Sequence, residues 1–371
     1  MHVGSRLLWS VASLAVPFTA DAAPRYSLTF IDPGSTAWGA RPVSINDRGE
    51  VTGYIDRDPT GSPDVPDRPF VWSGPGTLRE LAVPAGTVDN VMGHAINNRG
   101  EVLGNIGNNV LIWAPDGSSR TIAPPAGQSW VGPRDFNDAG TLVSETWQEG
   151  VASSTVRRRA DGTLDVTQSG FRPGFLSDVM NASGAVAGLT WTDIPRPVVW
   201  DADGTLRILS TPRGGGEAMA INDAGLVAGT YGFEGNSSEV IASAVWRPNG
   251  EFVAIPLVPG VDVDSQRPYG VNNLGQVVGY TNLTNHDNDA YYWSEADGVH
   301  DLQALLDASG ADWNLQWAVD INEAGQILAV GAIRGRTGFQ GVLLTPVPEP
   351  TMGAGVMLLC GAVISRRFRG R

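Results

Sequence analysis

Between residues 26 and 345, short apolar runs alternate with clusters of Gly, Asn, Asp and Pro. An apolar residue followed by Asn-x-x-Gly-x-apolar recurs seven times, with the asparagine at Asn46, Asn97, Asn137, Asn181, Asn222, Asn272 and Asn322. Successive asparagines lie 51, 40, 44, 41, 50 and 50 residues apart. This spacing is typical of propeller blades and longer than that of most helical repeats. The pattern therefore predicts seven copies of one β-sheet unit.

Two turn signals divide each repeat into four short strands. Asn-x-x-Gly is typical of a type I turn, which favours Asn at its first position and Gly at its fourth. A second turn, Asp-Gly or Asn-Gly, follows an apolar run that ends in Trp in most repeats, as at Trp113 and Trp246. We name the four strands a, b, c and d in chain order. They predict one four-stranded antiparallel blade per repeat.

The last repeat lacks a fourth strand, because its third strand leads directly into Pro346. An apolar segment of the right length, residues 26–32, precedes the first repeat. We expect this segment to complete blade seven and close the ring, so that no sheet edge stays unpaired. The predicted fold is an all-β, seven-bladed propeller over residues 23–346.

The predicted topology divides the disc into two faces. The a–b and c–d turns lie on one face, which we call the turn face. The b–c and d–a connections lie on the other, which we call the loop face. The b–c connections at 56–67, 231–240 and 281–288 are long, and binding residues are often carried on such loops.

Residues 1–22 have the order of a secretory signal peptide. Arg6 precedes the apolar run 7–18, and Ala20-Asp21-Ala22 satisfies the small-x-small cleavage rule. We expect cleavage after Ala22. The alternative is an N-terminal anchor, for which the apolar run is short.

Residues 347–371 contain Pro348, Glu349 and Pro350, then an apolar stretch over 352–364. A basic end follows, with arginines at Arg366, Arg367, Arg369 and Arg371. The apolar stretch predicts a short transmembrane helix with its arginines on the cytoplasmic side. In these three ordered features the segment resembles the PEP-CTERM sorting signals. The resemblance implies processing by exosortase, a transient anchor in the inner membrane of a Gram-negative bacterium, and an exopolysaccharide or biofilm setting.

The repeats resemble those of the extracellular HAF-repeat proteins over nearly the whole body. The likeness rests on Asn-x-x-Gly-x-Val-x-Gly, as in 222–229, and on the ending 301–346. The eponymous His-Ala-Phe is absent: residues 68–70, 196–198 and 289–291 read Arg-Pro-Phe, Arg-Pro-Val and Asp-Ala-Tyr. No role of that histidine is carried over. The family implies architecture and an extracellular location without a defined activity.

Charge and residue types narrow the range of functions. The segment 347–371 holds four arginines and one glutamate, so the body 23–346 carries −17 while the whole chain carries −14. A nucleic-acid partner is therefore not expected. The histidines of the body, His94, His286 and His300, fall in different repeats without zinc-ligand spacing. We nominate no catalytic residue and no cofactor. The alternative is a secreted polysaccharide-active enzyme, which predicts carboxylates converging in the central channel or on the loop face.

Two groups of tryptophans are distinguished by the repeat register. One ends strand c and is expected to pack between blades: Trp72, Trp113, Trp200, Trp246 and Trp293. The other falls outside the register, and all of its members but Trp317 are expected near the loop face: Trp38, Trp130, Trp147, Trp191, Trp313 and Trp317. For all of these but Trp317 we hypothesise stacking on a glycan or contact with an envelope protein. The alternative is that they fill the wide end of the disc.

The acidic loop 56–67 has the donor order of a calcium loop, with oxygens at positions 1, 3, 5, 9 and 12 and Gly61 at position 6. Three prolines interrupt it, and Asp67 replaces the usual glutamate at position 12. The favoured interpretation is a solvated acidic loop, with calcium as the alternative.

We expect the melting temperature of the protein to be the same in millimolar calcium and in chelator, because a solvated loop has no bound ion to lose. Differential scanning calorimetry in the two buffers measures this. A rise in calcium that magnesium does not reproduce would establish the calcium site instead.

Overall fold

The structure is a computed structural model of the 371-residue chain. It describes residues 23–348 except 35–36, 59–64, 150, 168–169, 175–178, 192–193, 213, 234–239 and 286. The expected signal peptide and all but the first two residues of the expected sorting tail lie outside the described residues. Within the described part, no helix is long and apolar enough to cross a membrane.

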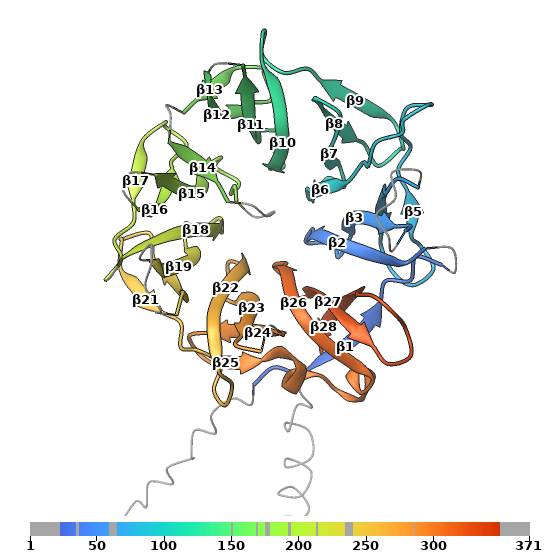
Figure 1. Cartoon of the computed structure of the whole chain (residues 1–371), viewed down its shortest axis with the longest axis vertical. Helices are drawn as coiled ribbons and strands as arrows, with labels where there is room; N and C mark the ends of the chain where they lie inside the picture. The colour runs from blue at the N-terminus through green and yellow to red at the C-terminus, as the bar shows by residue number, and fades with distance from the viewer. Residues whose placement is uncertain are drawn as a thin grey trace, which may run out of the picture.

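Seven antiparallel sheets of four strands surround a central axis (Figure 1). The predicted seven-bladed, all-β propeller is thereby confirmed. Two short 3-10 helices follow strand β25, η1 (Leu302–Leu305) and η2 (Ala308–Gly310). In each blade, strand a is nearest the axis.

Every blade holds its strands in the spatial order a, b, c, d. Blades one to three contain β2 (Gly39–Ile45), β3 (Val51–Asp56), β4 (Arg68–Trp72), β5 (Arg79–Glu80); β6 (Gly93–Ile96), β7 (Val102–Ile106), β8 (Asn109–Trp113), β9 (Ser119–Ile122); and β10 (Ser129–Phe136), β11 (Leu142–Gln148), β12 (Val151–Arg158), β13 (Leu164–Val166). Blades four and five contain β14 (Phe171–Pro173), β15 (Val186–Trp191), β16 (Pro195–Trp200), β17 (Leu206–Ile208); and β18 (Gly215–Ile221), β19 (Val227–Phe233), β20 (Ala242–Trp246), β21 (Phe252–Ala254). Blades six and seven contain β22 (Val263–Val271), β23 (Val277–Leu283), β24 (Asn288–Ser294), β25 (Gly298–Asp301); and β26 (Trp313–Ile321), β27 (Ile327–Ile333), β28 (Gln340–Pro346), β1 (Tyr26–Phe30).

The Asn-x-x-Gly turns form as predicted. In the first, the Oδ1 atom of Asn46 accepts the backbone N–H groups of Arg48 and Glu50 at 3.1 and 2.9 Å. Gly49 has a φ of 75°, a conformation that costs a residue without a Cβ very little. The side chain of the asparagine therefore fixes each a–b connection.

The strand-c tryptophans pack between blades. All five are at most 6% exposed. Trp113 of blade two donates its indole N–H to Ala82 O of the preceding blade, and Trp246 of blade five donates in the same way to Ser210 O, both at 2.7 Å. The predicted packing role is confirmed, and the indole N–H groups add a directional link.

Strand β1 closes the ring. It pairs antiparallel with β28 in register Tyr26↔Pro346 through Phe30↔Val342, and it is the outermost strand of blade seven. The predicted closing segment is confirmed, although the strand ends at Phe30 rather than at residue 32. The Tyr26 side chain is fully buried in the blade-seven core, 6.3 Å from the ring of Tyr292 in blade six. The first strand of the chain thus also packs against the neighbouring blade.

Substitution of Tyr26 tests this closure. We expect Tyr26→Ala to lower the free energy of unfolding by about 3–5 kcal/mol, the usual loss for a buried aromatic side chain. The Tyr26 hydroxyl is buried without a hydrogen-bond partner among the described residues, so Tyr26→Phe should leave stability unchanged or raise it. Denaturant unfolding followed by tryptophan fluorescence measures both. Equal stabilities of the alanine variant and the wild type would contradict a docked closing strand.

Candidate functional site

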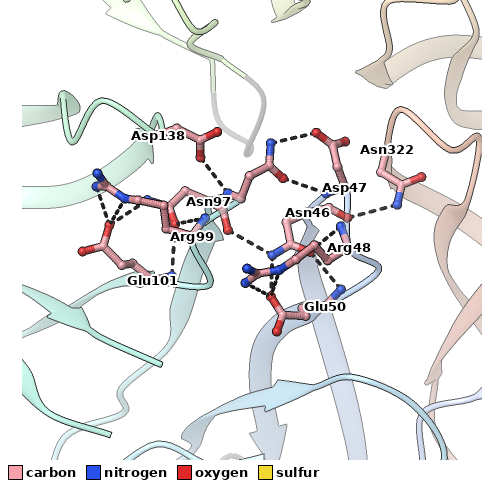
Figure 2. Close-up of polar contacts among 10 residues, drawn as sticks. Asn46, Asp47, Arg48, Glu50, Asn97, Arg99, Glu101, Asp138 and Asn322 are labelled. Carbon is pink, nitrogen blue, oxygen red and sulfur yellow. Dashed lines mark hydrogen bonds and ion pairs between the residues drawn. The ribbon is translucent and has the colours of Figure 1, made fainter. Parts of the chain in front are cut away.

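The repeat asparagines form a ring at the centre of the turn face, in which hydrogen bonds join six of the seven neighbouring pairs. We call this ring the asparagine belt: Asn46, Asn97, Asn137, Asn181, Asn222, Asn272 and Asn322. In most blades, the side-chain Nδ2 of the belt asparagine donates to the backbone oxygen of the belt asparagine in the next blade. Asn46 donates to Asn97 O in this way, at 3.0 Å. Asn322 donates to Asn46 at 3.0 Å and so joins blade seven to blade one (Figure 2). Four further links join blades three to seven in sequence. In blade two, Asn97 donates to Glu101 at 2.9 Å.

A second ring is formed by the residues that follow the belt asparagines. Their side-chain oxygens accept the backbone N–H of the preceding blade: Asn98 accepts from Asp47 at 2.8 Å, and Asp138 accepts from Asn98 at 2.7 Å (Figure 2). Asp223 and Glu323 do the same in blades five and seven. Burial raises the pKa of Glu323, and the carboxylates of Asp47 and Asp223 raise it further. These four acidic residues surround a hollow of about 150 Å³ at the channel mouth.

Two buried carboxylates that the sequence did not single out join neighbouring blades. Asp135 accepts the backbone N–H of Met180 in the next blade at 2.9 Å. Asp320 accepts the N–H of Ile45 at 2.9 Å. Both residues occupy the position two before a belt asparagine, where most repeats carry a small or apolar residue. An aspartate at a position where most repeats carry a small or apolar residue is the signal that could have identified each of them.

The environment of Asp135 bears on the enzyme alternative. Burial raises the pKa of Asp135 to about 7, and the nearby carboxylate of Asp320 contributes to the rise. However, Asp135 is only 7% exposed, and its other oxygen accepts the N–H of Phe136 at 2.7 Å. Asp320 is 1% exposed and is bonded in the same way to its own strand. Linking of adjacent blades therefore accounts for both carboxylates without a catalytic role.

The two body histidines that the structure describes lie in different blades, His94 in β6 and His300 in β25. His94 Nε2 lies 2.8 Å from Asn105 Oδ1, and burial lowers the pKa of His94. His300 Nε2 lies 2.9 Å from Asp297 O. His286 is outside the described residues. Among the residues that the structure describes, no group of three or more His, Cys, Asp or Glu side chains could hold a metal ion.

The middle of the candidate calcium loop, 59–64, lies outside the described residues. Of its flanks, Asp56 lies 3.5 Å from Arg41, and burial raises the pKa of Asp67. Calorimetry in calcium and in chelator is therefore the test of the calcium alternative.

The off-register tryptophans separate by burial. Trp130 is 4% exposed and donates its indole N–H to Ile122 O at 3.2 Å. Trp313 is 9% exposed and packs on Phe30, with ring centroids 5.7 Å apart. Packing accounts for these two side chains, because neither leaves a ring face free for a sugar. Trp147 is 50% exposed at the loop-face end of β11.

Three more tryptophans complete this group. Trp317 packs edge-on against Phe339 at 4.8 Å. The Trp191 side chain is outside the described part of the structure.

Trp38 is half-buried and lies on a hollow of about 510 Å³. We call this the loop-face hollow. Its walls come from described residues of the connection after β1 and of the b–c connection of blade seven, and it is lined in part by Asp32, Trp38, Arg336, Thr337 and Gln340.

Comparison with known proteins gives the fold class. No protein-family model and no curated protein matches the chain. Among solved structures, a streptogramin B lyase is similar at 14% identity and a TM-score of 0.54, covering 87% of this chain and 98% of its own. An oligogalacturonate lyase from Vibrio parahaemolyticus is similar at 11% identity and a TM-score of 0.55, covering 88% and 98%. An acylaminoacyl peptidase from Pyrococcus horikoshii is similar at 12% identity and a TM-score of 0.56, covering 87% and 53%. These likenesses show a shared propeller fold and nothing more.

The asparagine belt predicts a stability difference between two asparagines of blade five. Asn222 donates to Asn272 O at 2.8 Å in the neighbouring blade and is buried. Asn249 is exposed, and among the described residues its side chain makes only a local turn bond, accepting the N–H of Glu251 at 3.0 Å. We expect Asn222→Ala to cost about 2–3 kcal/mol, because it leaves buried backbone groups unpaired, and Asn249→Ala to cost about 0.5–1 kcal/mol. Denaturant unfolding measures both, and equal losses would contradict an inter-blade role.

Asp135 predicts a pH dependence. Its folded pKa lies above that of an unfolded aspartate, so the stability it contributes is complete at low pH and is lost as the pH rises through about 7. We expect the stability of the wild type relative to Asp135→Asn to fall by at most about 1.4 kcal/mol per pH unit between pH 4 and 7. Urea unfolding at several pH values measures it. Parallel pH profiles of the two proteins would refute a raised pKa at this position.

Proposed function

We propose that this chain is an exported, non-catalytic surface protein whose propeller binds a glycan, or a partner that carries one, through its loop face. Export rests on residues 1–22. Delivery to the envelope rests on the resemblance of 347–371 to a sorting signal processed by exosortase. The proposed location is the outer surface or extracellular matrix of a Gram-negative bacterium, after a transient anchor in the inner membrane.

The observation that carries the proposal is where the two ends of the propeller lie. Tyr26 pairs with Pro346, and the N–H of Val347 donates to Arg25 O at 2.7 Å. Pro346 also lies next to Gly325 in the a–b turn of blade seven, 3.5 Å from the position that a Cβ at Gly325 would take. Both ends therefore leave the propeller side by side on the turn face. A tail anchored in a membrane would hold that face toward the bilayer and leave the loop face accessible.

The two faces also differ in what their polar groups do. On the turn face, the belt and the ring outside it bond mainly to each other. The loop face carries the exposed Trp147 and the loop-face hollow. Flat aromatic side chains beside carboxylates and amides suit sugars, which offer apolar ring faces and many hydroxyls. These features favour glycan binding over a purely structural role.

The alternative function is a secreted polysaccharide-active enzyme. The observation that favours it is the pKa of Asp135, which burial raises to about 7 within the central channel. An oligogalacturonate lyase is among the proteins with a similar fold, but at 11% identity this supports only the scaffold. The burial and the backbone bonds of Asp135 favour the non-catalytic proposal.

One experiment separates these functions. The protein, purified in the form that its host exports, is incubated with exopolysaccharide of the same host, and both retention and new reducing ends are measured. We expect retention without new reducing ends. Reducing ends that disappear in Asp135→Asn would favour the enzyme, and absence of retention would contradict glycan binding.

Trp147 provides the mutational test. We expect Trp147→Ala to weaken retention about twofold to tenfold, the effect of losing one aromatic stacking contact. Leu274→Ala is the matched control, because Leu274 is 67% exposed in an a–b turn on the opposite face. A larger effect of the control than of Trp147→Ala would place the binding surface on the turn face.

A further inference from the structure

The loop-face hollow has the size and composition of a small-ligand site. Its volume of about 510 Å³ lies within the usual range of about 300–1,000 Å³ for such sites. Its two walls come from opposite ends of the chain, which strand β1 brings together by pairing with β28. The hollow therefore exists only in the closed ring.

Gln340 lines the hollow and holds Trp38 in place. Gln340 is 1% exposed, and its Nε2 donates to Trp38 O at 2.9 Å. Its Oε1 atom is buried and has no hydrogen-bond partner among the described residues. A buried, unpaired acceptor is unfavourable. Because this oxygen is closed off from solvent, Gln340 serves to hold Trp38 in place and its Oε1 atom is not a contact for a ligand.

Trp38 forms an aromatic wall that is held in place. Its backbone N–H donates to Asp56 O at 2.8 Å, and its oxygen accepts from Gln340. The edge of its indole lies against Gly338, where a Cβ would come within 2.3 Å of the indole nitrogen. Gly338 also has a φ of 77°, which favours glycine. The glycine thus leaves room for the ring in this position.

The rim of the hollow carries one charge of each sign. The Arg336 guanidinium lies over the Phe30 ring, 5.0 Å from its centroid, and Phe30 is supported by Trp313. Asp32 accepts the N–H of Gly34 through Oδ1 at 3.1 Å. The site therefore offers donors and acceptors for hydroxyl groups without a net charge. Because the body carries −17, its field repels a polyanion.

We propose that the loop-face hollow binds one uncharged pyranose residue of a glycan. The sugar ring stacks on Trp38, one hydroxyl donates to Asp32, and Arg336 donates to a sugar oxygen. The site rests on the proposed glycan-binding function and names its ligand class and its location.

Binding to the exported form of the protein is measured by calorimetry with three neutral hexasaccharides, cellohexaose, maltohexaose and laminarihexaose, and with hexagalacturonate as the charged probe. We expect at least one neutral hexasaccharide to bind and hexagalacturonate to bind more weakly. Trp38→Ala should weaken the neutral ligand at least tenfold, and Trp38→Phe, which keeps an aromatic face, should weaken it less. Arg336→Ala, at an exposed side chain, serves as a second variant that leaves the core intact. Leu274→Ala, at an exposed side chain on the turn face, is the control outside the hollow.

The outcomes separate this site from the broader proposal. A neutral ligand that binds Trp38→Ala and Arg336→Ala as tightly as the wild type overturns the site, as does preference for hexagalacturonate or failure of all three neutral probes. If exopolysaccharide is still retained in those cases, the glycan-binding function stands and another part of the loop face performs it. If the wild-type protein does not retain exopolysaccharide at all, the proposed function itself is contradicted.

Discussion

The structure depends on closing a ring of seven sheets, none of which can bury both of its faces alone. Two interactions at opposite radii hold the ring closed. Near the axis, the asparagine belt ties blade seven to blade one through Asn322 and Asn46. At the rim, strand β1 completes blade seven, and its Tyr26 reaches the core beside blade six. Packing must supply this stability, because the only cysteine, Cys360, lies outside the propeller.

In the closed ring, the polar side chains of the two faces make different kinds of contact. Each belt asparagine uses its oxygen for its own turn and, in most blades, its nitrogen for the next blade, so the turn face is uniform and largely self-satisfied. The loop face is free of this constraint, and its connections vary in length and composition. Since both chain ends leave from the turn face, a tail at the C-terminus and a binding surface on the loop face are compatible in one molecule.

The blade number, the turns, the closing strand and the packing tryptophans were predictable, because each follows from local residue preferences repeated at a fixed spacing. The hydrogen bonds from the belt asparagines to the next blade were not predictable, because the Asn-x-x-Gly turn alone explains an asparagine at that position. Asp135 and Asp320 pair with backbone groups of the next blade, whose register a single sequence does not reveal. Burial separates Trp130 from Trp147, although both fall outside the repeat register. The loop-face hollow joins Trp38 to Arg336, about three hundred residues away in the chain, and only the closed ring places them together.

The most direct test of the division between a structural turn face and a binding loop face is hydrogen–deuterium exchange of the exported protein with and without exopolysaccharide of its host. We predict that the glycan slows exchange in loop-face connections, including 31–34 and 334–339, and leaves the seven Asn-x-x-Gly turns unchanged. Slower exchange confined to those turns and the channel mouth would contradict this division.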